Sequence, residues 1–412
     1  MKPDGVRVPE PTRVDKVLPE HLADEALSLV VFGPGKGEAQ VVVLPDGRVG
    51  VVDGCREPSS PGGDPVREFL AALDQRASLR GESFRLAFVC LTHPHDDHYA
   101  GLGRLLQAYR GRVDAVWSVS KVGDRYAEAL SSYVGATHAG RKPLPDDAKV
   151  RGLERVLHEF IEAYERQGSR LRQVSQSKSL LKETVHTRRL KISACGPADR
   201  DVDKAQLALV KGIEDLLVEG EHAVGFDPNA TSGALVIRWG DAGMLLGGDL
   251  LCARGDIRGW EDVWHEIEPP IQVVKVAHHA SAEAHHDGLW QRLGAPLAIV
   301  TPFKDARGSM PPRPEQISRL ARDAVVAISS VPDWPPGCSD HPQSLYPVPR
   351  PPRSRQGGAK ARNGVLPMAS NPGPVDAHNA VAVSLDPTGK LVRFVLAGGA
   401  NVYDEPTRST GL

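Results

Sequence analysis

Six consecutive positions, from His93 to His98 in the stretch LTHPHDDHYAG, hold three histidines and two aspartates. Imidazole and carboxylate groups at this density are typical ligands of zinc, with manganese or iron as alternatives. The spacing His-x-His-x-Asp-His suits two ions side by side, because within a loop His93 and His95 can point one way while Asp97 and His98 point another. Two such ions lie ~3.5–4 Å apart and need a bridging carboxylate to offset their charge. The stretch therefore predicts a dinuclear metal site.

Two further stretches offer ligands, each at the end of an apolar run. Asp249 follows such a run in LLGGDL and could supply the bridging carboxylate. His278 and His279 follow another run in KVAHHAS. Each stretch alone is a weak indication, because loop histidines are often simply solvated. Three strand ends that meet at one sheet edge would form a single site.

The apolar runs predict the elements that position these loops. LAFVC, followed by Leu91, indicates a buried strand, and AGLGRLLQAYRG after the histidine cluster has the leucine spacing of a helix. Short runs separated by glycine turns in LSLVVFG, AQVVVLPDG and VGVVDG indicate a β-meander. The chain should then become largely helical over 104–200, where LERVLHEFIEAYERQ carries an apolar helical face. Strand patterns resume from LKISACGP to LAIVTP.

Composition sets wider limits on the function. The chain has 412 residues, is 41% hydrophobic and carries a formal net charge of −2, so its overall charge gives no argument for binding nucleic acid or membrane. Its five cysteines lack any CxxC spacing and resemble reduced thiols. No run approaches the ~20 apolar residues of a membrane span, and the first residues lack an apolar leader. We therefore expect a cytoplasmic protein without a membrane partner.

These patterns divide the chain into four segments. Residues 1–26 are polar and proline-bearing, and we expect a loosely held arm. The main domain should cover 27–330, with the helical insertion at about 104–200. A Pro/Arg-rich loop or linker is expected over 331–375, because its composition cannot build a packed core. Strands in 376–412 should pack on the main domain.

Over roughly residues 27–330 the motifs resemble those of the metallo-β-lactamase superfamily. The HxHxDH motif is matched in full, Asp249 matches the bridging aspartate, and Asp53 in VVDG matches an aspartate that supports the metal loop. The resemblance implies an α/β fold, an αββα sandwich with its active site at the shared edge of two sheets. It also implies two divalent metal ions as cofactors, zinc in the first place and manganese as the alternative.

Within the superfamily the motifs are most similar to the hydrolase domain of bacterial DNA-uptake (competence) channel proteins and its soluble relatives. The shared features are the turn at Gly35–Ala39, LPDG, LTH, Asn229 with Ser232, LLGGD and KVAHHAS. The membrane channel of those proteins has no counterpart here. The resemblance is therefore to the soluble catalytic unit.

Two assignments stay open. Ser281 follows His279 at the spacing that the superfamily usually shows after its metal ligand, which favours His279 as ligand and His278 as a second-sphere or substrate-contacting group; the reverse remains the alternative. The third motif, usually a histidine before the bridging aspartate, is not evident. Asn229 stands near its expected position, and the other candidates, which lie early or far upstream, are His222, His138, His158 and His186.

The predicted function is metal-dependent hydrolysis, with Asp97 orienting the nucleophile or accepting its proton. The resemblance favours a phosphodiester substrate, either a nucleic acid or a nucleotide, which Lys275, His278 and the basic segment Arg350–Arg362 could contact. For Lys275 a structural lysine is the favoured interpretation, and for the basic segment an ordinary linker. A lactone, thioester or β-lactam hydrolase is the alternative within enzymes. A binding or sensor module with a degenerate metal site is the alternative outside them. The sequence assigns no protein partner.

Overall fold

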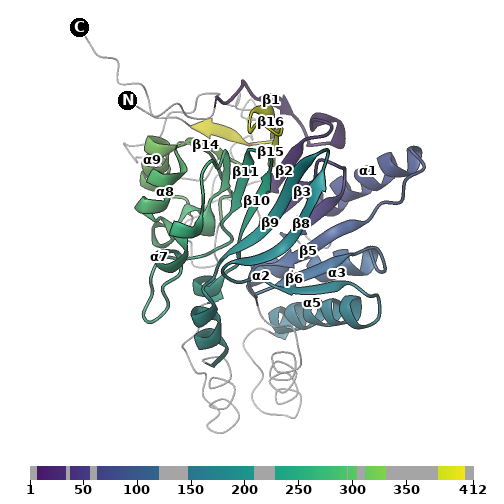
Figure 1. Ribbon diagram of the computed structural model, residues 1–412, viewed down its shortest axis with the longest axis horizontal. Helices are drawn as coiled ribbons and strands as arrows, with labels where there is room; N and C mark the ends of the chain where they lie inside the picture. Colours follow the sequence, from purple (N-terminus) through teal and green to yellow (C-terminus); the bar gives the residue numbers. More distant parts are fainter. Residues whose placement is uncertain are drawn as a thin grey trace, which may run out of the picture.

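The computed structural model describes residues 7–33, 38–55, 63–119, 147–207, 228–294, 296–303, 311–330 and 379–403. Two β-sheets pack face to face in these residues, and helices cover the outer face of each sheet, giving four layers (Figure 1). This is the αββα sandwich that the sequence predicts. No helix among the described residues is long and apolar enough to cross a membrane.

The first sheet has the strand order β1-β16-β15-β2-β3-β4-β5-β6-β7. Strands β4 to β7 run parallel to one another, so their carboxyl ends lie at the same edge. Apolar side chains of three helices pack on its outer face. The bounds are β1 (Thr12–Val14), β2 (Leu27–Phe32), β3 (Ala39–Val43), β4 (Val49–Val52), β5 (Leu86–Leu91), β6 (Ala115–Ser118), β7 (Arg170–Gln173), β15 (Ala380–Leu385), β16 (Leu391–Ala397), α1 (Pro65–Leu79), α3 (Leu102–Ala108) and α5 (Asp147–Glu165).

The second sheet has the order β17-β14-β13-β12-β11-β10-β9-β8. Its strands β11 to β14 are parallel, and β8 to β11 are antiparallel. Apolar side chains of three other helices cover its outer face. The bounds are β8 (Lys178–Val185), β9 (Arg188–Gly196), β10 (Ala234–Trp239), β11 (Ala242–Leu246), β12 (Val273–Lys275), β13 (Leu297–Val300), β14 (Val325–Ile328), β17 (Asn401–Tyr403), α7 (Trp260–Val263), α8 (Asp287–Leu293) and α9 (Pro314–Asp323).

Short helical turns lie in the loops between these elements. Two of them carry candidate ligands, namely α2 after β5 and η4 after β12. The bounds are η1 (Pro19–His21), α2 (Asp96–Tyr99), η2 (Pro228–Thr231), η3 (Trp264–Glu266), η4 (Ala277–Ala280) and η5 (Ala282–Ala284).

The expected helical insertion over 104–200 is wrong for much of its length. Strands β6 and β7 complete one edge of the first sheet, and β8 and β9 form a hairpin at the edge of the second. The hairpin strands have one face turned to solvent, so charged residues such as Lys182 and Arg188 alternate with buried ones such as Leu190. That alternation is typical of an antiparallel edge. LKISACGP predicts most of β9, whereas the many charges of β8 hide that strand in the sequence.

Both ends of the described chain belong to the sheets. Residues 12–14 of the expected loose arm form β1, which pairs in parallel with β16. Strands β15 and β16 lie inside the first sheet, where β15 pairs with β2, and β17 pairs with β14 in the second. These C-terminal strands are therefore integral to the two sheets. The Pro/Arg-rich segment lies outside the described residues.

The layer between the sheets contains a close aromatic contact between β5 and β6, next to β4. The ring of Phe88 stacks on Trp117 with 4.0 Å between centroids and 8° between planes, and both side chains are buried. Phe88 also lies directly over Gly50, so that a Cβ at position 50 would overlap its ring. A glycine is needed here for space, since the stacked indole prevents the phenyl ring from withdrawing.

We predict that Gly50→Ala lowers the free energy of unfolding by about 1–3 kcal/mol, the usual cost of overpacking a core. Urea denaturation measures it. A Gly50→Ala/Phe88→Leu double variant should lose less stability than the sum of the two single variants, because the smaller side chain leaves room for the methyl group. Wild-type stability of Gly50→Ala would show that the close approach is not a constraint.

Candidate metal centre

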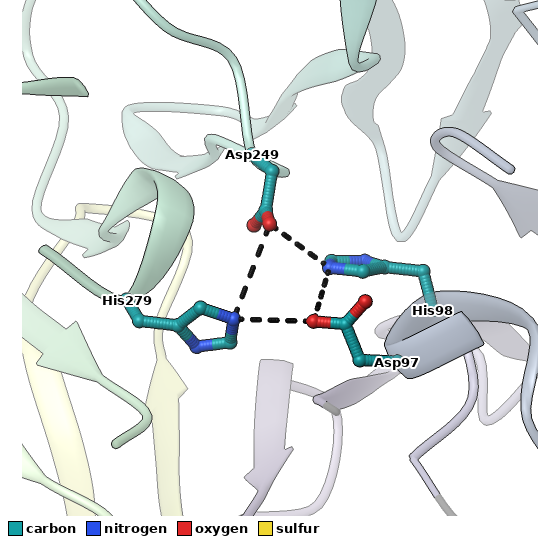
Figure 2. Close-up of side chains that lie close together, drawn as sticks. All are labelled: Asp97, His98, Asp249 and His279. Atoms are coloured by element: carbon teal, nitrogen blue, oxygen red, sulfur yellow. Dashed lines mark ion pairs between the residues drawn. The ribbon is translucent and has the colours of Figure 1, made fainter. Parts of the chain in front are cut away.

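Three loops from the two sheets meet at one edge of the sandwich. The loop after β5 carries Asp97 and His98, the loop after β11 carries Asp249, and η4 after β12 carries His279. Figure 2 shows the four side chains pointing toward one another. Each offers one ligand atom, and these atoms all lie within 4.8 Å of one another. Because the strands end at the same edge, residues far apart in sequence form one buried cluster.

The distances within the cluster suit a bound cation. Asp249 Oδ2 lies 3.2 Å from His98 Nε2 and 3.9 Å from His279 Nε2, while Asp97 Oδ2 lies 3.6 Å from His279 Nε2. Zinc bonds of about 2.0–2.2 Å in a tetrahedral arrangement place their ligand atoms roughly 3.3–3.6 Å apart. The cluster needs only small adjustments to reach that geometry.

Several ligand atoms of the site have no hydrogen-bond partner among the described residues. These buried atoms are the Nε2 atoms of His93, His98 and His279, and Asp249 Oδ1. A buried polar atom without a partner costs about 1–3 kcal/mol. Three of these residues, His98, His279 and Asp249, belong to the cluster, and a metal ion would satisfy their unpartnered atoms, so the residues present fit a divalent cation.

The pKa shifts describe the same charge balance. Burial alone would lower the pKa of His98, but the carboxylates of Asp249, Asp53 and Asp97 outweigh it and raise the pKa well above its ordinary value. Burial would raise the pKa of Asp249, yet His98 and His279 hold it well below its usual range. The carboxylates of Asp97 and Asp249 therefore stay ionised beside positively charged histidines. A divalent ion can supply that positive charge in place of the protons on the histidines.

Asp53 supports His98 from the side away from the cluster. Its Oδ2 lies 2.7 Å from His98 Nδ1, and its carboxylate accepts hydrogen bonds from the backbone N–H and the hydroxyl of Thr92, both at 2.7 Å. With the proton on Nδ1, the Nε2 atom of His98 faces the ligands as a bare acceptor. This matches the supporting role that the resemblance implies for Asp53.

His93 and His95 lie on the same loop, beside the four-residue cluster. His93 is buried, its Nε2 lies 4.0 Å from Asp249 Oδ2, and its Nδ1 lies 3.1 Å from Ser232 Oγ. Burial, then the neighbouring His98 and His95, lower the pKa of His93 well below its ordinary value, which keeps it neutral and able to bind metal. His95 is half-buried, with its ring 4.9 Å from that of His93. These two histidines do not belong to the four-residue cluster, and the second ion that the sequence assigns to them stays a prediction.

The paired histidines lie within a strained turn. His278, His279 and Ala280 all have positive φ, at 46°, 54° and 61°. Such left-handed residues cost of order 1–3 kcal/mol each and often mark functional sites. The turn places His279 in the cluster, in agreement with the favoured assignment.

His278 occupies the rim of the same site. Its Nε2 lies 3.3 Å from Asn229 Nδ2 and 4.0 Å from Asp249 Oδ2, and its Nδ1 lies 2.9 Å from Ser281 Oγ. The structure therefore brings Asn229, the possible third-motif position, to the site. His158 on α5 and His186 in the β8–β9 turn are exposed instead, and His138 and His222 lie outside the described residues.

Lys275 lies in the protein interior, which agrees with the structural lysine that the sequence favours and not with the alternative of a substrate contact. Its side chain is fully buried, and its Nζ lies 2.5 Å from Glu38 Oε2 and donates to the carbonyl of Val276. The lysine side chain therefore points into the protein interior, toward Glu38. The basic segment Arg350–Arg362 lies outside the described residues.

Sequence reasoning missed four residues that support the ligands: Thr92, Glu38, Thr301 and Ser232. Ser232 had been noted as part of a motif without a role, and its Oγ accepts a hydrogen bond from the backbone N–H of Asp249. The position of Thr92 directly before His93 was a usable signal, because a hydroxyl next to a ligand can bind its support. Glu38 lies in the turn at Gly35–Ala39, which had likewise been noted as a motif without a role, and nothing in the sequence links Thr301 to the site.

The comparison with protein families agrees with this geometry. The model of the metallo-beta-lactamase superfamily matches residues 61–289, more than half of the chain. The chain belongs to this superfamily, and its buried His/Asp cluster is consistent with the metal site of a metal-dependent hydrolase of that group. A search of curated proteins gave no match.

Solved structures show only distant likeness. A variant of the CmlA beta-hydroxylase is 14% identical with a TM-score of 0.35, and the alignment covers 66% of this chain but 45% of that one. Igni18, a metallo hydrolase from Ignicoccus hospitalis, is 12% identical with a TM-score of 0.32, covering 66% and 81%. AidC, a dizinc quorum-quenching lactonase, is 13% identical with a TM-score of 0.28, covering 52% and 56%. These likenesses are too distant to bear on activity.

We predict that Asp249→Ala loses more bound metal than any other single ligand variant, because its carboxylate lies within reach of every imidazole of the site except His95 and its loss leaves two cations repelling each other. Elemental analysis after reconstitution with zinc or manganese measures the metal. The wild type should hold about two ions per chain, as dinuclear sites do. His158→Ala and His186→Ala are matched controls that should keep their metal. Loss of a full equivalent in either control would contradict this assignment.

Proposed function

We propose that this chain is a metal-dependent phosphodiesterase or nuclease. The observation that carries the proposal is the buried cluster of Asp97, His98, Asp249 and His279, whose ligand atoms lie within 4.8 Å of one another. Two divalent ions bound between this cluster and His93 and His95 would supply Lewis-acid stabilisation of an anionic substrate and lower the pKa of a water molecule.

Asp97 is the residue placed to handle the proton of the attacking water. Its side chain is 11% exposed, whereas that of Asp249 is 2% exposed, so the carboxylate of Asp97 reaches the open side of the cluster. Burial would raise the pKa of Asp97, but the nearby His98 and His279 hold it low by their positive charge, which keeps the carboxylate ionised as an acceptor. Asp97 thus orients the water while it also serves as a ligand.

His278 is placed to contact the substrate. Its side chain is 24% exposed at the rim, and Ser281 and Asn229 lie within hydrogen-bond distance of its two ring nitrogens. The amide Nδ2 of Asn229 can only donate, so Nε2 of His278 accepts in this arrangement. Once protonated on Nε2, the partly exposed imidazole beside Asp249 can donate a hydrogen bond to a substrate oxygen or a proton to a leaving group. Asn229 orients the ring and offers an amide to the same oxygens.

Two features favour a phosphodiester over an acyl substrate. A phosphodiester carries negative charge and gains more on its oxygens in the transition state, which a dication pair and neutral donors such as His278 and Asn229 can stabilise. Asn229 also stands where the superfamily usually has its third-motif histidine, as in the competence-type relatives that the sequence resembles. Lactone, thioester or β-lactam hydrolysis is the rival outcome of the test.

We predict that the metal-loaded protein cleaves a phosphodiester, tested with bis(p-nitrophenyl) phosphate, DNA and RNA beside a lactone and a thioester. His278→Gln should lower kcat by about 10²-fold or more while metal content stays at the wild-type level, because a proton donor contributes roughly 10²–10⁴. Asp97→Asn should abolish activity. The control is His265→Gln, an exposed histidine on η3, which should keep full activity.

The other outcomes separate the rival functions. Cleavage of the lactone or thioester with no cleavage of any phosphodiester would assign the acyl substrates instead. Bound metal without hydrolysis of any of these substrates would contradict a hydrolase and favour the binding or sensor module.

A further inference from the structure

A buried ion pair lies beside His279, near the ring nitrogen Nδ1 that faces away from Asp97 and Asp249. The Nζ of Lys275 and Oε2 of Glu38 are 2.5 Å apart, and both side chains are fully buried. Moving two charges out of water is expensive, and apolar residues of similar size often do as well or better for stability. An ion pair at this position therefore calls for a role other than stability.

Glu38 contacts the supports of two ligands from different loops. Its backbone N–H donates to the carbonyl of Asp97 at 3.2 Å. Its Oε2 accepts a hydrogen bond from the hydroxyl of Thr301, the residue that follows β13, and lies 3.5 Å from His279 Nδ1. His279 Nδ1 in turn donates to the carbonyl of Thr301 at 2.9 Å, with the Thr301 hydroxyl at 3.2 Å.

These contacts determine the state of the His279 ring. The Thr301 carbonyl can only accept, so the proton of a neutral His279 sits on Nδ1 and leaves Nε2 bare toward Asp97 and Asp249. The single hydroxyl proton of Thr301 is committed to Glu38, so the hydroxyl presents a lone pair to Nδ1 and strengthens the same arrangement. The negative charge of Glu38 near Nδ1–H makes Nε2 a more basic ligand. The ammonium group of Lys275 lies beside that carboxylate, out of contact with water.

We propose that Glu38, held by Lys275, is a positioning residue that prepares His279 and the Asp97 segment for metal. The inference rests on the metal-dependent function proposed above. It gives His279 the same kind of carboxylate support that Asp53 gives His98, here relayed through Thr301 and drawn from the loop before β3. His98 is thus supported by Asp53, and His279 by Glu38 and Thr301, so that residues next to strands of both sheets support the cluster.

The experiment titrates Co²⁺ into the metal-free full-length protein and follows its visible absorption, with the thermal midpoint of the metal-free protein recorded in parallel. Glu38→Gln should weaken Co²⁺ binding by about 10–100-fold, the usual effect of losing a partner of a metal ligand, and should shift the visible bands of His-bound Co²⁺. Thr301→Val, which removes the relay but keeps the ion pair, should weaken binding in the same direction.

A double variant separates positioning from stability. In Glu38→Gln/Lys275→Met no charge is left buried alone, so the thermal midpoint should recover relative to either single variant while Co²⁺ affinity stays low. This variant also decides the matter if Glu38→Gln alone does not fold. The matched control is Glu159→Gln on α5, which removes a buried carboxylate that accepts from Gln107 and Arg110. It should lower stability and leave Co²⁺ affinity unchanged.

Three results would overturn the inference. Glu38→Gln with wild-type affinity and spectrum would show that the carboxylate does not act on His279. A double variant that regained both stability and affinity would reduce the ion pair to a structural element. A wild-type protein that bound no Co²⁺ would remove the proposed function as well, whereas the first two results leave that function standing.

Discussion

The burial of one carboxylate, that of Asp249, governs the arrangement of this molecule's active edge. Asp249 is 1% exposed, and an ionised carboxylate in such a place is costly unless positive charge and hydrogen bonds compensate for it. Imidazoles from two loops, including His98 and His279, supply that compensation. Because these loops belong to different sheets, the sandwich has to close at this edge for the charges to balance. Folding and the metal site are therefore coupled through the same charges.

The ligands are held from behind as well as in front. Asp53 fixes His98, Ser232 fixes the backbone of Asp249, and Glu38 lies behind His279. Each support comes from a segment distant in sequence from the ligand it holds. Such outer partners set the tautomer and direction of a ligand before metal arrives, which lowers the cost of ordering the site on binding. The strained turn at His278 and His279 is one place where the fold spends stability to achieve this order.

The sequence predicted the residues of the buried cluster because candidate ligands and strand ends are both local signals. His98 and Asp249 each follow an apolar run, and parallel strands bring such ends to a common edge. The direction in which the Lys275 side chain points could not be predicted locally, because it depends on Glu38, which directly precedes β3 of the other sheet. Glu38 itself adjoins a glycine-rich turn, and nothing nearby marks it as a partner of a histidine.

Secondary structure followed the same rule. Continuous apolar strands such as β5 and β11 were evident, whereas β8 was hidden by its solvent-facing Lys and Glu residues and by the strong helical pattern of α5 before it. His278 and His279 both lie in a left-handed turn that contains no glycine, so the sequence does not indicate the turn. The choice between those two histidines therefore had to rest on resemblance until the geometry was seen.

The most direct measurement of the central claim is anomalous X-ray diffraction from crystals grown with zinc or manganese, with data collected above and below the absorption edge of the metal. The account predicts an anomalous peak in contact with His98, Asp97, Asp249 and His279, and a second on the side of His93 and His95 with Asp249 between the two. Full occupancy of metal elsewhere on the chain, with no peak at Asp249, would contradict it.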